Sequence, residues 1–135
     1  MKKRYTLIED FYIKGYLYEH LQGKVYTSAL LEVKLNIPLK FVSRFIIKRY
    51  QLGEVNNMEY ADSVVFEKRD LLYNESERLI QFSTSDLGYG KSMGKVTYYI
   101  CVIPVLDNGC IGEDIYEKSR ILCVTMPQGS DQNAD

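Results

Sequence analysis

Basic and hydroxyl side chains recur at short spacing within residues 38–52 of this 135-residue sequence. They are Lys40, Ser43, Arg44 and Lys48. Lysine and arginine bind phosphate oxygens, and arginine and serine also donate hydrogen bonds to base edges in the major groove. On a helix, side chains three and four residues apart lie on the same side. If the segment is helical, these four residues therefore indicate a surface that binds nucleic acid.

A second set of side chains could hold a magnesium ion. Glu32 and Lys34 lie two residues apart, so a strand would place them on one side, and Asp10 could join them from a neighbouring strand. This set resembles the core of restriction-type nucleases, in which carboxylates hold Mg²⁺ and the metal activates water. With ten Glu and eleven Lys in the chain, about one Glu-x-Lys is expected by chance. We therefore predict that the protein is not an enzyme, with a Mg²⁺-dependent nuclease as the alternative.

The cysteine and histidine pattern predicts no metal site. Cys101, Cys110 and Cys123 lack the close pairs typical of zinc sites, and His20, the only histidine, is distant in the sequence. We expect neither a metal nor a cofactor.

An amphipathic helix over residues 38–52 is the element that would position the basic residues. Its apolar face would consist of Leu39, Val42, Phe45, Ile46 and Tyr50. Pro38 suits a first helical turn, and Gly53 suits a helix end that follows Lys48 and Arg49.

Residues 25–37 fit two structures, and the choice between them decides the functional prediction. Apolar residues alternate with polar ones along the segment, which is typical of a half-buried strand. A strand over residues 10–19 could pair with it through a turn at residues 20–24. In the alternative, residues 28–35 form a short helix and Asn36 begins the turn into the next one.

In the helical alternative, residues 28–49 resemble the helix-turn-helix of winged-helix regulators. The resemblance implies a DNA-binding regulator in which Lys40, Ser43, Arg44 and Lys48 face the major groove or its phosphates. Glu32 departs from that pattern, because it falls where such motifs carry a small buried residue. In the strand alternative, Glu32 lies on the outer side with Lys34, where we expect solvent to surround its charge.

The chain after Gly53 is typical of antiparallel strands. Runs rich in Val, Ile, Tyr and Thr occupy residues 63–67, 78–83, 95–106 and 120–126. Residues 107–109, Asp-Asn-Gly, predict a tight turn, and residues 127–135 predict a flexible polar tail.

Charge divides the sequence into two halves. Residues 1–53 carry a net charge of +6, whereas residues 54–135 carry −7. We therefore predict an α+β fold in which a basic N-terminal half, with the 38–52 helix, packs against an acidic, mainly antiparallel sheet. Residues 1–126 would form a single domain.

These features predict a small non-enzymatic nucleic-acid-binding protein, with a helix-turn-helix-type regulator as one form. The alternative is a protein–protein interaction module, such as an inhibitor, adaptor or assembly component, that uses the acidic half or a sheet rich in the chain's 12 tyrosines. Either form could be a homodimer. The longest uncharged apolar run, residues 98–106, is far shorter than the roughly 20 residues of a membrane-spanning helix. We expect a cytoplasmic protein with no membrane partner.

Overall fold

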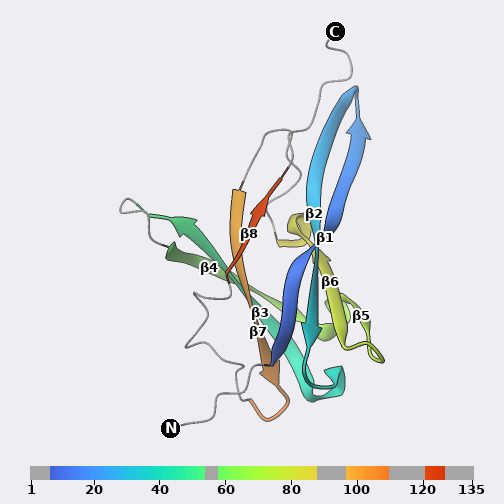
Figure 1. The fold of residues 1–135 in the computed structure, drawn as a ribbon, viewed down its shortest axis with the longest axis vertical. Coiled ribbons are helices and arrows are strands. Elements are labelled where there is room, and N and C mark those ends of the chain that lie inside the picture. Colours follow the sequence, from blue (N-terminus) through green and yellow to red (C-terminus); the bar gives the residue numbers. More distant parts are fainter. Residues whose placement is uncertain (1–6, 54–57, 88–96, 110–120, 127–135) are drawn as a thin grey trace.

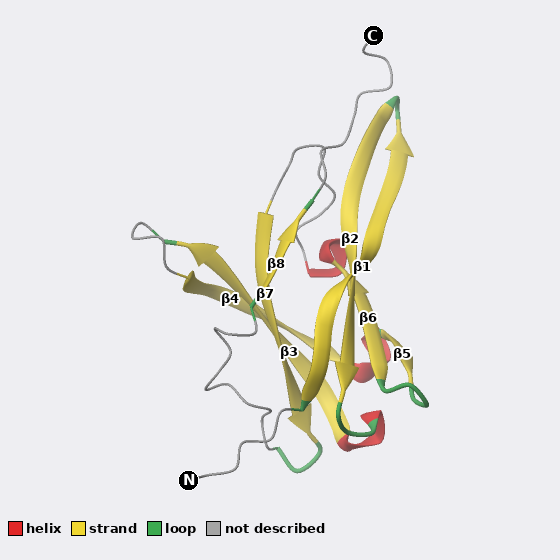
Figure 2. Ribbon diagram, viewed as in Figure 1, coloured by secondary structure: helices red, strands yellow, loops and turns green. Residues whose placement is uncertain are grey.

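A computed structural model describes residues 7–53, 58–87, 97–109 and 121–126, and antiparallel strands dominate these residues (Figure 1). The strands are β1 (Ile8–Leu21), β2 (Lys24–Leu35), β3 (Val42–Leu52), β4 (Met58–Glu67), β5 (Leu72–Asn74), β6 (Leu79–Ser83), β7 (Thr97–Leu106) and β8 (Leu122–Thr125). The helices found in these ranges are short 3₁₀ helices, η1 (Leu39–Phe41), η2 (Lys68–Asp70) and η3 (Thr84–Leu87) (Figure 2). The predicted α+β fold is therefore wrong, because the described fold is nearly all β.

Two four-stranded sheets combine the basic and acidic halves of the sequence. Sheet A has the order β1-β2-β6-β5, and sheet B has the order β4-β3-β7-β8. Each sheet therefore contains strands from both halves. This arrangement corrects the prediction that a basic half packs against a separate acidic sheet.

The inner faces of the two sheets share one hydrophobic core. Sheet A contributes Leu31 and Val33 of β2, and sheet B contributes Phe45 and Ile47 of β3 and Val102 of β7. All but Val102, which is 3% exposed, are fully buried. Burial of these apolar side chains between the two sheets provides most of the free energy that holds the sheets together.

β2 shows that the strand interpretation of residues 25–37 is correct and the helical one is wrong. Its alternate side chains point into the core and are buried: Val25, Thr27, Ala29, Leu31, Val33 and Leu35. The first helix of the proposed helix-turn-helix is therefore absent.

β1 and β2 form a long hairpin whose turn lies at the top of Figure 1, beyond the other strands. The turn residues Gln22 and Gly23 have φ angles of 52° and 77°. Positive φ at both central residues matches the twist of the flanking strands, and glycine adopts it without steric strain. Between Ile13 and Gly15 the pairing register shifts, so Lys14 is an inserted residue in β1.

The expected helix over residues 38–52 is instead η1 followed by β3. β3 lies between β4 and β7, and it carries apolar side chains on both faces. Phe45 and Ile47 face the core, whereas Ile46 and Tyr50 belong to a second cluster on the opposite face. A strand with apolar residues on both faces also contains apolar residues three and four positions apart, which is the spacing of an amphipathic helix. This overlap explains why a helix was wrongly predicted here.

The strands predicted for the C-terminal half are present as parts of β4, β6, β7 and β8. The predicted turn is also present: Gly109 has a φ of 86°, and its N–H donates to the Leu106 carbonyl at 2.9 Å. The predicted tail, residues 127–135, lies outside the described residues. Within the described ranges, no helix is both long and apolar enough to cross a membrane.

Candidate functional site

A buried carboxylate lies on the outer face of sheet A. Glu32 lies toward the C-terminal end of β2, and its side chain is only 3% exposed. It points away from the core because its neighbours in sequence, Leu31 and Val33, point inward. The expectation that solvent would surround its charge is wrong.

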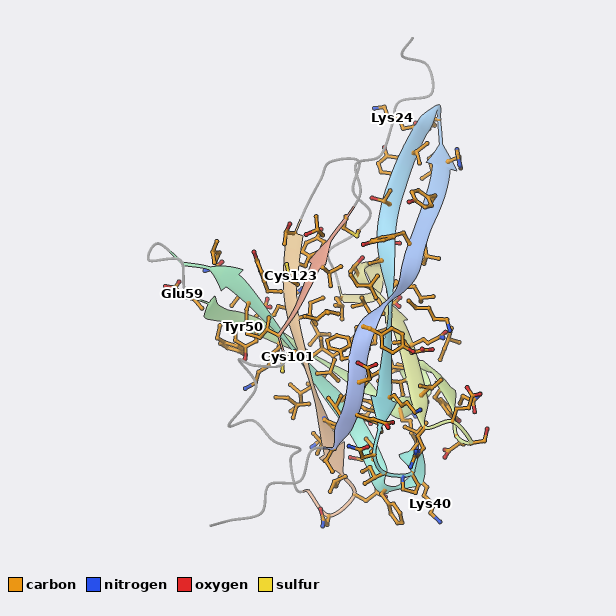
Figure 3. The ribbon with its side chains drawn as sticks, viewed as in Figure 1. Lys24, Lys40, Tyr50, Glu59, Cys101 and Cys123 are labelled. Atoms are coloured by element: carbon orange, nitrogen blue, oxygen red, sulfur yellow. The ribbon has the colours of Figure 1, made fainter. Side chains whose placement is uncertain are left out.

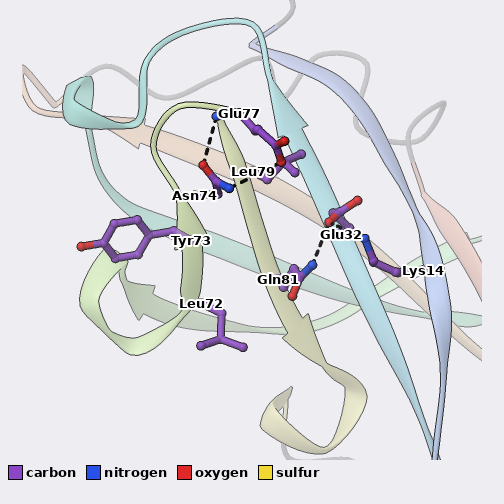
Figure 4. Close-up of a pocket in the computed structure, with 8 residues that line it drawn as sticks. All are labelled: Lys14, Glu32, Leu72, Tyr73, Asn74, Glu77, Leu79 and Gln81. Carbon is purple, nitrogen blue, oxygen red and sulfur yellow. Dashed lines mark hydrogen bonds and ion pairs between the residues drawn. The ribbon is translucent and has the colours of Figure 1, made fainter.

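Three strands position the groups around Glu32. The Gln81 amide of β6 donates a hydrogen bond to Glu32 Oε1 at 2.8 Å, and the Lys14 ammonium of β1 lies 3.4 Å from the same oxygen (Figure 4). Gln81 lies directly opposite Glu32 in the β2–β6 register. The bulge in β1 supplies Lys14. Burial of a carboxylate is strongly unfavourable unless it has such partners.

These groups line a depression of about 240 Å³. Its other lining residues are Leu72, Tyr73, Asn74, Glu77 and Leu79. Leu72 is 70% exposed, the highest fraction among the large apolar residues that the structure describes. In Figure 4, the Tyr73 ring points away from Glu32, whereas Lys14, Glu32 and Gln81 point toward one another. We call this feature the Glu32 depression.

The Glu32 depression therefore combines apolar side chains with two carboxylates and one ammonium. Its charged lining residues are Lys14, Glu32 and Glu77. Glu77 accepts a hydrogen bond from the Asn74 amide at 3.5 Å. An apolar contact surface beside a small number of fixed polar groups is typical of a recognition site.

The residues predicted to hold magnesium, Asp10, Glu32 and Lys34, lie together on the outer face of sheet A. Asp10 lies opposite Lys34 in the β1–β2 register, and Glu32 is two residues from Lys34 on the same strand. The ammonium of Lys34 pairs with Glu9 at 3.5 Å, while Glu32 contacts Lys14 and Gln81. Among the residues that the structure describes, no three His, Cys, Asp or Glu side chains lie together in a way that could hold a metal.

The four predicted nucleic-acid-binding residues do not share a helix, because only Lys40 lies in η1 and the other three lie in β3. Lys40 belongs to η1, at the lower end of Figure 3, and its ammonium lies 5.2 Å from the centre of the Phe41 ring. Ser43 donates a hydrogen bond to the Val105 carbonyl at 3.2 Å. Arg44 and Lys48 share one face of β3, about 13 Å apart along the strand. The recognition-helix arrangement is therefore wrong.

A second, larger depression lies where β3, β4 and β7 meet. Its volume is about 610 Å³, and its lining includes Arg49, Asp62 and Tyr98. Arg49 donates two hydrogen bonds to the Asp62 carboxylate and a third to the Leu87 carbonyl. Hydrogen bonding from Arg49 lowers the pKa of Asp62 below its ordinary value. Burial raises the pKa of Tyr98. Arg49 already binds both oxygens of the Asp62 carboxylate, whereas both contacts to Glu32 reach only Oε1.

Sequence reasoning did not find the Glu32 depression as a site. It singled out Glu32, but it missed Lys14, Gln81 and Leu72, which lie on three other strands. Glu32 and Gln81 are 49 residues apart, so no local spacing connects them. The nearest signal was Glu32 itself, a charged residue in a strongly apolar strand.

No family model matches the chain, and neither a curated protein nor a solved structure matches it.

Proposed function

We propose that this chain is a non-enzymatic protein–protein interaction module that binds its partner at the Glu32 depression. The observation that carries the proposal is the highly exposed Leu72 side chain beside a buried, hydrogen-bonded carboxylate. Contiguous apolar surface beside polar groups marks protein interaction sites, and Tyr73, which is 50% exposed, adjoins Leu72 in this lining.

The dimensions of the depression favour a side chain of a protein over a free small molecule. Pockets for small ligands usually enclose roughly 300–1,000 Å³, and the Glu32 depression is smaller, at about 240 Å³. A protein partner would fill it with one side chain and would cover Leu72 with the surrounding surface. A few residues that fill pockets near the centre of an interface usually contribute most of its binding energy.

The proposed function predicts that Leu72→Glu abolishes partner binding. A carboxylate in place of the leucine would be buried against the partner surface that covers Leu72, and burial of an unpaired charge is strongly unfavourable. The measurement is affinity capture from extracts of the source cells, followed by identification of the captured protein and calorimetry with that protein in purified form.

Leu52→Glu is the matched control, because Leu52 is also an exposed leucine but lies on β3 of sheet B. We expect the wild-type chain and this control to bind equally, and Leu72→Glu to bind at least about tenfold more weakly. Equal binding by all three chains would refute the proposed site. Retention on duplex DNA that weakens steeply with salt and depends on Arg44 and Lys48 would instead favour a nucleic-acid-binding protein.

A further inference from the structure

The carboxylate of Glu32 is held from one side only. Both of the contacts described above, from Lys14 and from Gln81, reach Oε1. The hydrogen bonds and ion pairs found among the described residues include none to Oε2. Because an ionised carboxylate offers about four acceptor positions, Glu32 has capacity for a further donor.

Lys14 is a loosely held partner of Glu32. Its ammonium lies 3.4 Å from Oε1, and its side chain is 50% exposed. Charge-assisted hydrogen bonds are usually about 2.7–2.9 Å long, so this contact is longer than a strong ion pair. Lys14 is half exposed, so its ammonium regains water when it moves aside. The cation that replaces it must then supply the partner that the buried Glu32 carboxylate needs.

A cation that displaced Lys14 would lie next to carboxylates and apolar side chains of the lining. Without the Lys14 ammonium, Glu32 and Glu77 would be the charged groups of the lining. A guanidinium presents two parallel N–H donors that match a carboxylate, whereas an ammonium is a single compact charge. The aliphatic part of an arginine side chain could lie along Leu72 and Leu79, which also line the depression.

We propose that the Glu32 depression is a subsite for an arginine side chain of the partner protein, and that Lys14 occupies part of this subsite in the unbound chain. This inference rests on the proposed function, because it names the group that the interaction module recognises. The guanidinium would donate to both oxygens of Glu32 while Gln81 kept its hydrogen bond to Oε1.

The test uses the full chain and a small probe, N-acetyl-arginine methylamide, in an NMR titration that follows backbone amide shifts. N-acetyl-citrulline methylamide is the matched probe, because it keeps the shape of arginine and lacks the charge. We expect the arginine probe to shift amides of Leu72, Gln81 and Glu32, and the citrulline probe to cause no comparable shifts. Equal responses to the two probes would overturn the inference.

Three variants sharpen the test. Lys14→Ala removes the competing cation and should tighten arginine binding about two- to fivefold. Glu32→Gln removes the charge and should weaken binding about tenfold, whereas Glu9→Gln, which changes an exposed carboxylate of β1, should leave it unchanged. If Glu32→Gln does not fold, the Lys14→Ala result still decides, since unchanged or weaker binding would contradict the proposed competition.

The outcomes separate this inference from the proposed function. If the arginine and citrulline probes respond alike while Leu72→Glu still abolishes partner capture, the interaction module stands and the arginine subsite is wrong. If the arginine probe binds as expected while Leu72→Glu leaves capture unchanged, the subsite exists and the proposed interface is wrong.

Discussion

The Glu32 carboxylate is almost completely buried on the outer face of sheet A, and side chains from two other strands contact it. Gln81 of β6 and Lys14 of β1 both direct their polar atoms to Oε1. If Glu32 is removed, the partly buried Gln81 amide loses its acceptor, whereas the half-exposed Lys14 ammonium regains water. The position of Glu32 therefore connects the proposed binding site to the stability of sheet A.

We predict that Glu32→Ala lowers the free energy of unfolding by about 1–3 kcal/mol, because it leaves the Gln81 amide unsatisfied. Urea denaturation measures the change. Glu9→Ala is the control, since Glu9 is 46% exposed and pairs with the similarly exposed Lys34. We expect that control to change stability by less than about 0.5 kcal/mol. Equal effects of the two substitutions would show that the hydrogen bonds to Glu32 do not stabilise the fold.

At the scale of elements, the Arg49–Asp62 pair joins β3 to β4. The two hydrogen bonds from Arg49 lower the pKa of Asp62 below its ordinary value of 3.8. A carboxylate whose pKa is lower in the folded than in the unfolded chain stabilises the fold above the unfolded-state pKa. This stabilisation is lost as the pH falls through the folded-state pKa.

We therefore predict that wild-type protein is more stable than Asp62→Asn at about pH 6 and that this difference shrinks toward about pH 2. Urea midpoints measured across this range test the prediction. In an Arg49→Gln background, the same Asp62→Asn substitution should show a smaller pH dependence, because the cause of the lowered pKa is gone. A pH-independent difference in both backgrounds would refute the assignment.

The elements differ in how far their sequences predict them. β2 has one buried and one outer face, so its alternation identified it, although a helix also fitted the segment. β3 is apolar on both faces, and a register shift after Val42 disturbs its period further. β5 has three residues and no periodicity to detect. The Glu32 depression depends on contacts between β1, β2, β5 and β6, which local patterns do not encode.

At the scale of the whole molecule, the division of charge along the sequence does not persist in the fold. Strands of the basic half lie beside strands of the acidic half in both sheets. Ion pairs such as Arg49–Asp62 then connect residues from the two halves. A separate basic surface, which non-specific nucleic-acid binding would favour, therefore does not follow from the net charge of residues 1–53.

The turn at Gln22 and Gly23 has a consequence for the order in which the chain folds. It brings β1 and β2 together across two residues, whereas the contact between Ser43 of β3 and Val105 of β7 spans 62 residues. Closing a long loop loses more chain entropy than closing a short one, and hairpins form within about 1–10 μs. The β1–β2 hairpin would then belong to the folding nucleus, and β8, at the edge of sheet B, would join later.

Gly23→Ala should accordingly slow folding, because alanine resists a φ of 77°, and should change the unfolding rate little. Val124→Ala, at a buried position in β8, should mainly accelerate unfolding. Stopped-flow folding and unfolding rates across a urea series distinguish these effects. If Gly23→Ala acted only on unfolding and Val124→Ala only on folding, assembly would begin in sheet B, and the hairpin that carries Glu32 would be among the last parts of the molecule to form.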